Sequence, residues 1–221
     1  MRTITALEVQ QRNKERVNVY LDGEYAFSLT LIEAARLRKG QELDPSAIEA
    51  LRSADDVQRA YDHAARFLSY RPRSEAEVRQ NLAQNQYSAA AVEAAIERLA
   101  GMGYLDDAAF TRYWVENRDT FKPRGPLALR YELRQKGVAE AIIEEALADF
   151  DTEDAAYRAA AERARRLRGS SRQVFSQKLG SFLQRRGFDY QTSRGVVEQL
   201  CEELNAEDPE FFPADPDEDM P

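Results

Sequence analysis

The chain has 221 residues, 32% of them charged and 43% hydrophobic, with a formal net charge of −8 at pH 7; this composition suits a globular protein with one large domain, or a small domain and a repeat array. No apolar run approaches the roughly 20 residues that a membrane-spanning helix needs, and the first residues lack the apolar core of a signal peptide. The single cysteine, Cys201, excludes an intrachain disulfide, so we expect a cytoplasmic protein without membrane contact.

The first residues predict a small three-stranded antiparallel sheet. Side chains alternate in polarity over 3–9, and two further alternating runs, 17–21 and 24–29, flank a turn at 22–23. The turn length decides which face carries the apolar residues Val17, Val19, Tyr25 and Phe27. A two-residue loop would separate the valines from the aromatics. A three-residue loop over 21–23, ending with a left-handed glycine, puts all four on one face, and we favour it.

From residue 30 onward every strong signal is helical. Thr30 and Glu33 fit a capping box. The Asp44-Pro45 pair reads as an N-cap followed by proline at the first helical position, and it predicts a short helix. A separate helix, capped by Asp55 or Asp56, is expected to run to about residue 69.

Three weakly similar helical units then follow, at a spacing of 51 and 50 residues between Leu82, Leu133 and Leu183. Apolar residues recur at the same offsets in each unit, at Val78, Leu129 and Leu179; Tyr87, Val138 and Phe188; Ile96, Leu147 and Val197; and Leu99, Phe150 and Leu200. A fixed period of this length indicates a tandem helical array. Such arrays build extended surfaces that bind macromolecules, and they seldom enclose a catalytic pocket.

The fold class that we predict is mainly α, with three tandem three-helix repeats preceded by a small antiparallel β-sheet or hairpin region. In each repeat the first two helices are joined by a tight turn. The expected divisions are 1–56 for the β-hairpin region with short helices, 57–120 for the first repeat with its leading helix, 121–170 for the second repeat, 171–204 for the third, and 205–221 for a disordered acidic, proline-rich tail.

Several short motifs resemble the RecX family of regulatory proteins. They are Arg71-Pro-Arg-Ser74 followed by Glu77, then Gly103-Tyr-Leu-Asp-Asp107 with Phe110, in the first repeat; Leu133-Arg-Gln-Lys-Gly-Val138 followed by Ile142 and Ile143 in the second; and Phe182-Leu-Gln-Arg-Arg-Gly-Phe188 in the third. The runs Val17-Asn-Val-Tyr-Leu-Asp-Gly23 and Leu68-Ser-Tyr-Arg-Pro-Arg-Ser74 are similar to members with an N-terminal extension. The likeness covers residues 1–204, and the acidic tail lies outside it.

This resemblance implies a non-enzymatic regulator that needs no cofactor. RecX proteins bind RecA, the recombinase that polymerises on single-stranded DNA, and they lie in the groove of its filament. They inhibit filament extension, ATP hydrolysis and strand exchange. The implied setting is homologous recombination, DNA repair and the SOS response, and the implied partner is RecA in its filament. We also expect weak direct binding to DNA, and a monomer.

A basic segment is the strongest local signal for a binding surface. Residues 158–186 contain nine bases and one acid, Glu162, whereas residues 201–221 contain nine acids and no base. The candidate contacts in this segment are Arg158, Arg163, Arg165, Arg166, Arg168, Arg172, Lys178, Arg185 and Arg186. Clustered arginine and lysine bind a polyanion through counterion release, although most charge runs are only a solvated helix face. The acidic tail would compete with DNA for this segment.

Four further candidates lie at repeat starts: Arg71, Arg73, Lys122 and Arg124. The alternative to a binding role is that the neighbouring prolines set the geometry of the helix start and that these cations are simply solvated. The Asp106-Asp107 pair is better read as a helix N-cap than as a metal site, since no second ligand cluster accompanies it. Tyr104 and Phe110 are expected in the core, and Trp114 is left open between core and base stacking.

Two other classes of protein remain to be weighed. A helix-turn-helix-like transcriptional regulator would bind duplex DNA by sequence, usually as a symmetric dimer. A protein scaffold without nucleic-acid contact would tolerate charge reversal at Arg165, Arg166 and Arg168. An enzyme is the least favoured class, since the sequence has no P-loop, no GxGxxG and no cysteine–histidine cluster.

Overall fold

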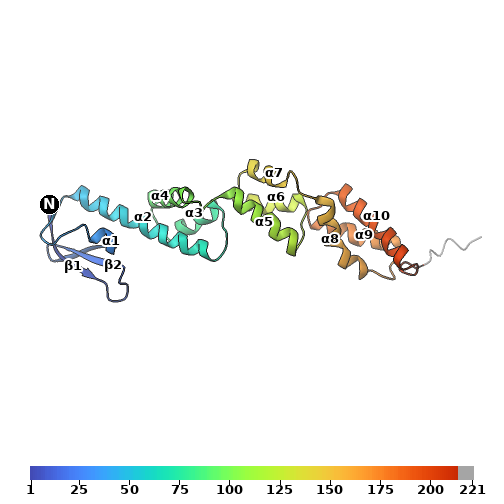
Figure 1. The fold of residues 1–221 in the computed structure, drawn as a ribbon, viewed down its shortest axis with the longest axis horizontal. Helices are drawn as coiled ribbons and strands as arrows, with labels where there is room; N and C mark the ends of the chain where they lie inside the picture. Colours follow the sequence, from blue (N-terminus) through green and yellow to red (C-terminus); the bar gives the residue numbers. More distant parts are fainter. Residues whose placement is uncertain (214–221) are drawn as a thin grey trace, which may run out of the picture. The chain divides into compact units, whose positions relative to one another are not determined.

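The computed structural model describes residues 1–213, and they fall into two compact units that meet in sequence between Asp106 and Asp107. The first unit holds an antiparallel sheet and four helices, from the short α1 (Leu31–Ala34) to α4 (Figure 1). The second unit holds helices α5 to α10. The architecture is therefore mainly helical with an N-terminal sheet, which confirms the predicted fold class.

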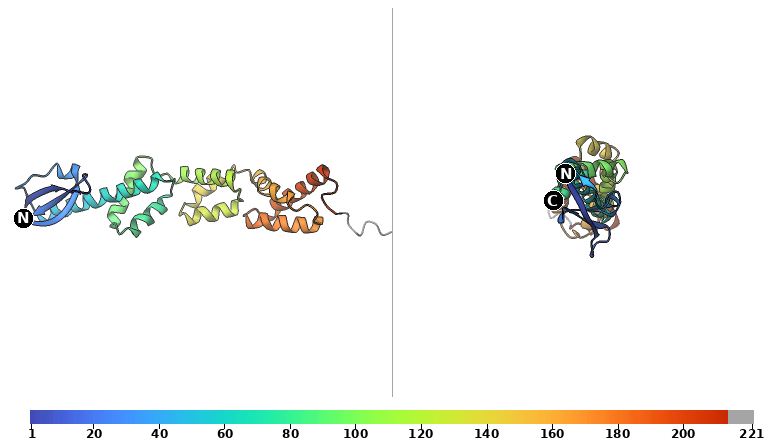
Figure 2. Two further views of the ribbon diagram at one scale, coloured as in Figure 1. Left: turned by 90° about the horizontal axis from the view of Figure 1, so that it is seen from below. Right: turned by 90° about the vertical axis from the view of Figure 1, so that its left-hand side faces the viewer.

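The sheet has four strands in the order β3-β2-β1-β4, one more than the three predicted. The strands are β1 (Arg2–Val9), β2 (Arg16–Leu21), β3 (Glu24–Thr30) and the short β4 (Glu42–Leu43). All three pairings are antiparallel. One face is apolar and contributes Ile4, Val17, Val19, Leu21, Phe27, Leu29 and Leu43 to a core. In Figure 2 the strands lie beside the first turns of α2, which cover that core.

The hairpin turn differs from our prediction. Leu21 pairs with Glu24, so the loop has two residues, and both Asp22 and Gly23 have positive φ, as in a type I′ turn. A register shift beyond the turn leaves one extra residue on β3, which is a β-bulge. The bulge brings Phe27 back to the face of the valines, whereas Tyr25 stays exposed. The prediction of a three-residue loop was wrong because a bulge in the strand, and not only the loop length, can decide which side chains share a face of the sheet.

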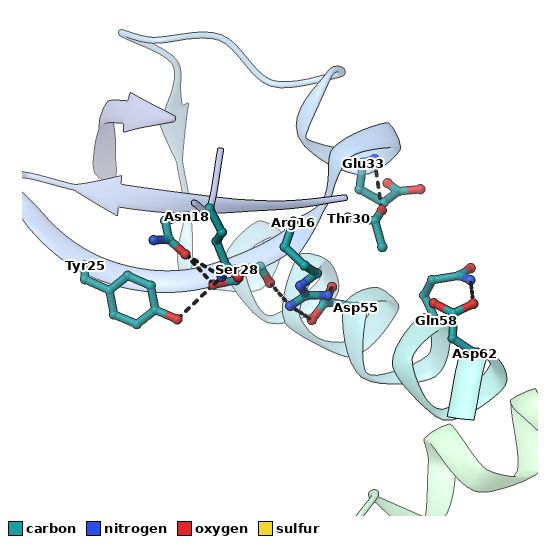
Figure 3. A network of polar contacts seen from close by, with 10 residues as sticks. Arg16, Asn18, Tyr25, Ser28, Thr30, Glu33, Asp55, Gln58 and Asp62 are labelled. Atoms are coloured by element: carbon teal, nitrogen blue, oxygen red, sulfur yellow. Dashed lines mark hydrogen bonds and ion pairs between the residues drawn. The ribbon is translucent and has the colours of Figure 1, made fainter. Parts of the chain in front are cut away.

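A single helix, α2 (Pro45–Ser69), replaces the two helices expected before the first repeat. It contains no glycine and no proline after its first residue, so nothing stops it at the expected boundary. Asp44 caps its start as predicted. Asp55 does not cap a helix. It lies on α2 and accepts two hydrogen bonds from the Arg16 guanidinium on β2, at 2.5 and 2.8 Å (Figure 3).

The first predicted division already included the leading helix, but the second and third three-helix groups begin one helix earlier than predicted. In the first unit, Ala60 and Ala64 of α2 pack with α3 (Glu75–Gln84) and α4 (Ala89–Gly101) around Leu82 and Leu99. In the second unit, α5 (Asp107–Phe121) packs with α6 (Pro126–Gln135) and α7 (Glu140–Leu147), and α8 (Thr152–Arg165) with α9 (Arg172–Arg185) and α10 (Tyr190–Glu207). The divisions at 57–120, 121–170 and 171–204 are therefore wrong. Each leading helix buries its apolar side against the pair that follows it.

The aligned apolar positions nevertheless form the repeat cores, as the period predicted. Leu82, Leu133 and Leu183 are each fully buried. Glycine at the end of the second helix has positive φ in two repeats of the second unit, at Gly137 and Gly187. This left-handed residue ends the helix and starts the tight turn to the third helix.

A backbone junction joins the two repeats of the second unit. The amide of Gly125 donates to the carbonyl of Arg186 at 3.0 Å, and the amide of Leu127 donates to that of Gly187 at 3.2 Å. Free amides at the start of α6 thus satisfy free carbonyls at the end of α9. The approach is so close that a Cβ on Gly125 would overlap the Gly187 carbonyl, and a Cβ on Gly187 would overlap Ala128.

The region beyond residue 204 also departs from the expectation of disorder. Helix α10 runs to Glu207, and the buried rings of Phe211 and Phe212 pack edge-to-face on Phe175 of α9. The amide of Gly169 donates to the Phe211 carbonyl at 2.9 Å. The tail prediction is therefore wrong for 205–213, where two large aromatic rings offset the low hydropathy of their neighbours. Residues 214–221 lie outside the described residues.

We expect Phe212→Ala to destabilise the second unit by about 2 kcal/mol, because it removes one buried aromatic side chain. Thermal unfolding followed by circular dichroism measures the loss, with Glu210→Ala, an exposed neighbour, as the control. An unchanged melting temperature would show that the last residues do not contribute to the core.

Candidate functional site

The structure separates the thirteen candidate cations by what their side chains contact. Six form ion pairs within the chain: Arg71, Arg124, Arg158, Arg165, Arg166 and Arg168. Four lie over aromatic rings: Arg73, Arg163, Arg172 and Arg186. The remaining three, Lys122, Lys178 and Arg185, are exposed and have no ion pair with the described residues. Only some of the basic segment is therefore available to an external anion.

The end of α8 is largely neutralised by the chain itself. Arg168 contacts Asp208 at 2.7 Å, and Arg165 lies 3.9 Å from Glu207. Arg166 pairs with Glu162 one turn earlier on the same helix. The acids at 207 and 208 are held close because α10 packs against α8. Exposed pairs of this kind contribute at most about 1 kcal/mol each, but they lower the local positive charge.

A different group of cations surrounds Phe182 on α9. The guanidinium carbon of Arg163 lies 4.8 Å from the centre of this ring, and that of Arg186 lies 5.0 Å from it. Arg186 also donates to the Pro123 carbonyl at 3.3 Å. Burial lowers the pKa of Arg186, and the neighbouring charges of Arg124 and Arg163 lower it further. We call Arg163, Phe182 and Arg186 the Phe182 cluster.

Arg124 connects this cluster to a polar hub centred on Glu132 of α6. One carboxylate oxygen of Glu132 lies 3.0 Å from the Arg124 Nε. The other oxygen accepts from the Arg118 Nε at 2.7 Å and from the Trp114 indole at 2.9 Å. Arg118 also lies over the indole ring, 4.5 Å from its centre. Trp114 is thus a half-buried structural residue, whereas Tyr104, which we expected in the core, is exposed.

We expect Glu132→Gln to weaken the second unit by about 1 kcal/mol, since an amide accepts hydrogen bonds from arginine more weakly than a carboxylate does. Chemical denaturation measures the change. The control is Glu144→Gln, which breaks a more exposed pair with Arg130 on the neighbouring helix and should cost less. Equal losses from the two substitutions would contradict a hub at Glu132.

Arg158 is a structural contact between helices. It donates to the Asp119 carbonyl and carboxylate, each at 2.7 Å, and to Asp154 at 2.7 Å. The Asp154 hydrogen bond is the main cause that raises the pKa of Arg158, and Asp119 adds to it. Its charge is already compensated by two carboxylates, which leaves it a weak candidate for an external anion.

The two arginines before α3 also have internal partners. Arg71 contacts Glu77 at 2.9 Å, and the Arg73 guanidinium lies 3.8 Å from the centre of the Phe67 ring. Burial lowers the pKa of Arg73, and the charge of Arg71 adds to that effect. Both contacts fix the entry to α3, where Ser74 and Glu77 form a capping box.

Two residues that organise the candidate surface were not among the sequence candidates. Phe182 was counted as part of a family motif, and Glu132 was not singled out. The available signal for Phe182 was its spacing on α9, since Lys178, Phe182 and Arg185 share one helix face at i, i+4 and i+7. The signal for Glu132 was absent, because its partners come from another helix and from a loop.

Family models match most of the chain. Residues 2–44 match the regulatory protein RecX N-terminal domain, 60–99 the first RecX three-helix domain, 106–147 the second and 151–197 the third. The matched ranges agree with the helix groups seen in the structure.

Individual relatives agree with the family models. The regulatory protein RecX of Bacillus subtilis (strain 168) is 34% identical over 213 residues, which cover 94% of this chain and 80% of that protein. The protein of the same name from Levilactobacillus brevis is 38% identical over 86% of this chain and 73% of its own length. A Lactobacillus delbrueckii subsp. bulgaricus relative is 43% identical over 70% of this chain, and the match spans only 57% of that relative.

Two solved structures are similar. A crystal structure of regulatory protein RecX has a TM-score of 0.71 and 31% identity, over 91% of this chain and 100% of that one. The crystal structure of RecX from Lactobacillus salivarius has a TM-score of 0.60 at 23% identity over 69% of this chain, and supports the fold. Within residues 1–213, no helix is both long and apolar enough to span a membrane.

Proposed function

Since the chain belongs to the RecX family of regulatory proteins, we propose that it binds the RecA filament on single-stranded DNA and inhibits filament extension, ATP hydrolysis and strand exchange. It acts by binding, without chemistry and without a cofactor. Its setting is homologous recombination, DNA repair and the SOS response in the cytoplasm, and it acts as a monomer. The relatives give no support to the alternative of a transcriptional regulator.

The observation that carries the proposal is the pair of repeats in the second unit, joined through backbone hydrogen bonds and bearing cations on both sides of the joint. Each repeat contributes a weak contact to the filament. Contacts on one connected body reinforce each other, because the first raises the effective concentration of the next. An array of this kind can cap or loosen a polymer of repeating protomers.

RecA ATP hydrolysis on single-stranded DNA tests the proposal. We expect inhibition when this chain is present at well under one copy per RecA, because a capped filament end stops the addition of many protomers. Adding the chain before or after filament assembly separates a block of extension from disassembly. A lack of inhibition even in excess over RecA would refute the proposed function.

In our proposal, the acidic end of the chain regulates the cationic surface of the second unit. Glu207 and Asp208 already pair with the end of α8, and residues 214–221 add four acids, Asp215, Asp217, Glu218 and Asp219. Deleting 205–221 would also remove the buried Phe211 and Phe212, so the cleaner variant ends at Pro213.

We expect this shorter chain to bind single-stranded DNA a few-fold more tightly at low salt, because a competing anion has been removed. Fluorescence anisotropy of a labelled oligonucleotide, measured at two salt concentrations, gives the change. Equal affinities for the full and shortened chains at both salts would remove the acidic end from the mechanism.

A further inference from the structure

We propose that the Phe182 cluster is the site at which this chain holds the phosphate backbone of single-stranded DNA, and that the more numerous arginines at the end of α8 are not. This inference rests on the proposed function, which it deepens by naming the contact. It divides one basic segment into a part that is open to phosphate and a part that the chain has already neutralised.

The geometry of the cluster is fixed by contacts with an aromatic ring and a backbone carbonyl, which leave the positive charge of its arginines in place. Arg163 comes from α8 and Arg186 from the end of α9, and both lie within about 5 Å of the same ring. The Pro123 carbonyl accepts from Arg186 and anchors it to the loop before α6. A guanidinium has five donors, so each arginine keeps free N–H groups. Arginine positioned in this way suits the paired oxygens of a phosphate.

Within residues 1–213, no carboxylate neutralises the two arginines of the Phe182 cluster. Neither Arg163 nor Arg186 has an ion pair with a described carboxylate, and the charges that lower the pKa of Arg186, beside burial, are those of Arg124 and Arg163. Gathering like charges costs free energy that an anion would recover. At the end of α8 the situation is reversed, because Arg165, Arg166 and Arg168 each have an acid of this chain as partner.

The cations continue along one face of α9. Lys178 and Arg185 flank Phe182 at helical spacing, are exposed, and have no ion pair with the described residues. From Lys178 to Arg186 the helix rises about 12 Å at 1.5 Å per residue. Each nucleotide of a strand carries one phosphate charge, so the backbone offers a series of charges along this row of cations.

A nucleic acid fits this row better than an acidic protein segment does. It supplies one charge per nucleotide whatever its sequence, and it has no need of an apolar anchor. The ring of Phe182 is covered by its two arginines, so it positions them rather than stacking on a base. We therefore expect little sequence preference and a strong dependence on salt.

The experiment compares two double variants that remove the same charge from neighbouring positions. The cluster variant, Arg163→Gln with Arg186→Gln, removes both positive charges of the Phe182 cluster. The matched control is Arg165→Gln with Arg168→Gln. Binding to a fluorescent oligothymidylate is measured by anisotropy from 50 to 300 mM salt. We expect the cluster variant to lose about tenfold or more in affinity, with the slope of log K against log salt reduced by about 1.4, the value for two lost phosphate contacts.

The control variant should change affinity by less than about threefold. A third variant, Lys178→Gln with Arg185→Gln, guards against loss of folding, because neither side chain has an ion pair within residues 1–213 to lose. It should weaken binding with an unchanged melting temperature. Equal losses in the cluster and control variants, or a larger loss in the control, would overturn the assignment.

The same proteins, tested on RecA, separate this inference from the proposed function. If the cluster variant binds the oligonucleotide normally but no longer inhibits RecA ATP hydrolysis, the cluster contacts an acidic segment of protein and our inference is wrong. If the intact chain never inhibits RecA, yet its DNA affinity depends on the cluster as expected, the proposed function fails and the phosphate site stands.

Discussion

Replacing Gly187 with alanine is expected to destabilise the second unit by about 3 kcal/mol, from two separate causes. The residue has φ of +88°, a region in which a side chain costs about 1 to 2 kcal/mol. A Cβ there would also overlap the Ala128 backbone and side chain across the repeat junction. Forcing extra volume into a packed contact costs typically 1 to 3 kcal/mol. Chemical denaturation followed by circular dichroism measures the sum.

Two other glycines isolate the two causes. Gly125 has an ordinary negative φ, but a Cβ would overlap the Gly187 carbonyl, so Gly125→Ala tests overlap alone. Gly103 has φ of +74° with open space around it, so Gly103→Ala tests backbone strain alone. We expect Gly187→Ala to cost more than either. A cost no greater than that of Gly103→Ala would show that the repeat junction adjusts to the added Cβ without a loss in the free energy of unfolding.

Replacing Asp55 with alanine should destabilise the first unit by about 3 kcal/mol. The Asp55 side chain is 9% exposed and its partner Arg16 only 17%, so the substitution leaves a guanidinium in a site with little water. Removing one member of a buried ion pair typically costs 3 to 5 kcal/mol, and the partial exposure of Arg16 places this case at the lower end. Thermal unfolding of the full chain reports the loss as an earlier transition.

A double variant separates the effect of an unpaired Arg16 charge from the effect of losing its hydrogen bonds to Asp55. Arg16→Met with Asp55→Leu replaces the pair by apolar side chains, and such replacements are often neutral or stabilising. We expect it to recover most of the stability that Asp55→Ala loses. A double variant as unstable as Asp55→Ala would show that the hydrogen bonds themselves, including that from Arg16 to the Ser28 carbonyl, hold the sheet to α2.

Periodicity was enough to predict the repeats, because burial depends on spacing along the chain. Leu82, Leu133 and Leu183 recur at one period, and each lies at the centre of a three-helix core. Periodicity does not say whether the third helix of a unit precedes or follows the pair. That choice depends on contacts such as those of α8 with α10, between residues about 40 positions apart in sequence.

The sequence was enough to predict which segment of the chain is basic, but not which residues of that segment contact one another or an acid. Counting charges identified residues 158–186 as basic. It could not show that Arg168 meets Asp208, or that Arg163 and Arg186 meet at Phe182. Those pairings are set by helix packing, which brings residues from different elements to one place. The bulge in the hairpin was missed for a related reason, since one inserted residue has no compositional signature.

The hub at Glu132 makes the chain a natural optical probe of its own binding. Trp114 is the single tryptophan, and the cations of Arg118 and Lys136 lie 4.5 and 4.9 Å from the centre of its ring. Its indole N–H donates to the same carboxylate that holds Arg124. An anion that drew Arg124 away from Glu132 would change the electric field across the indole. The emission spectrum of the unlabelled protein would then shift as the repeat junction is occupied.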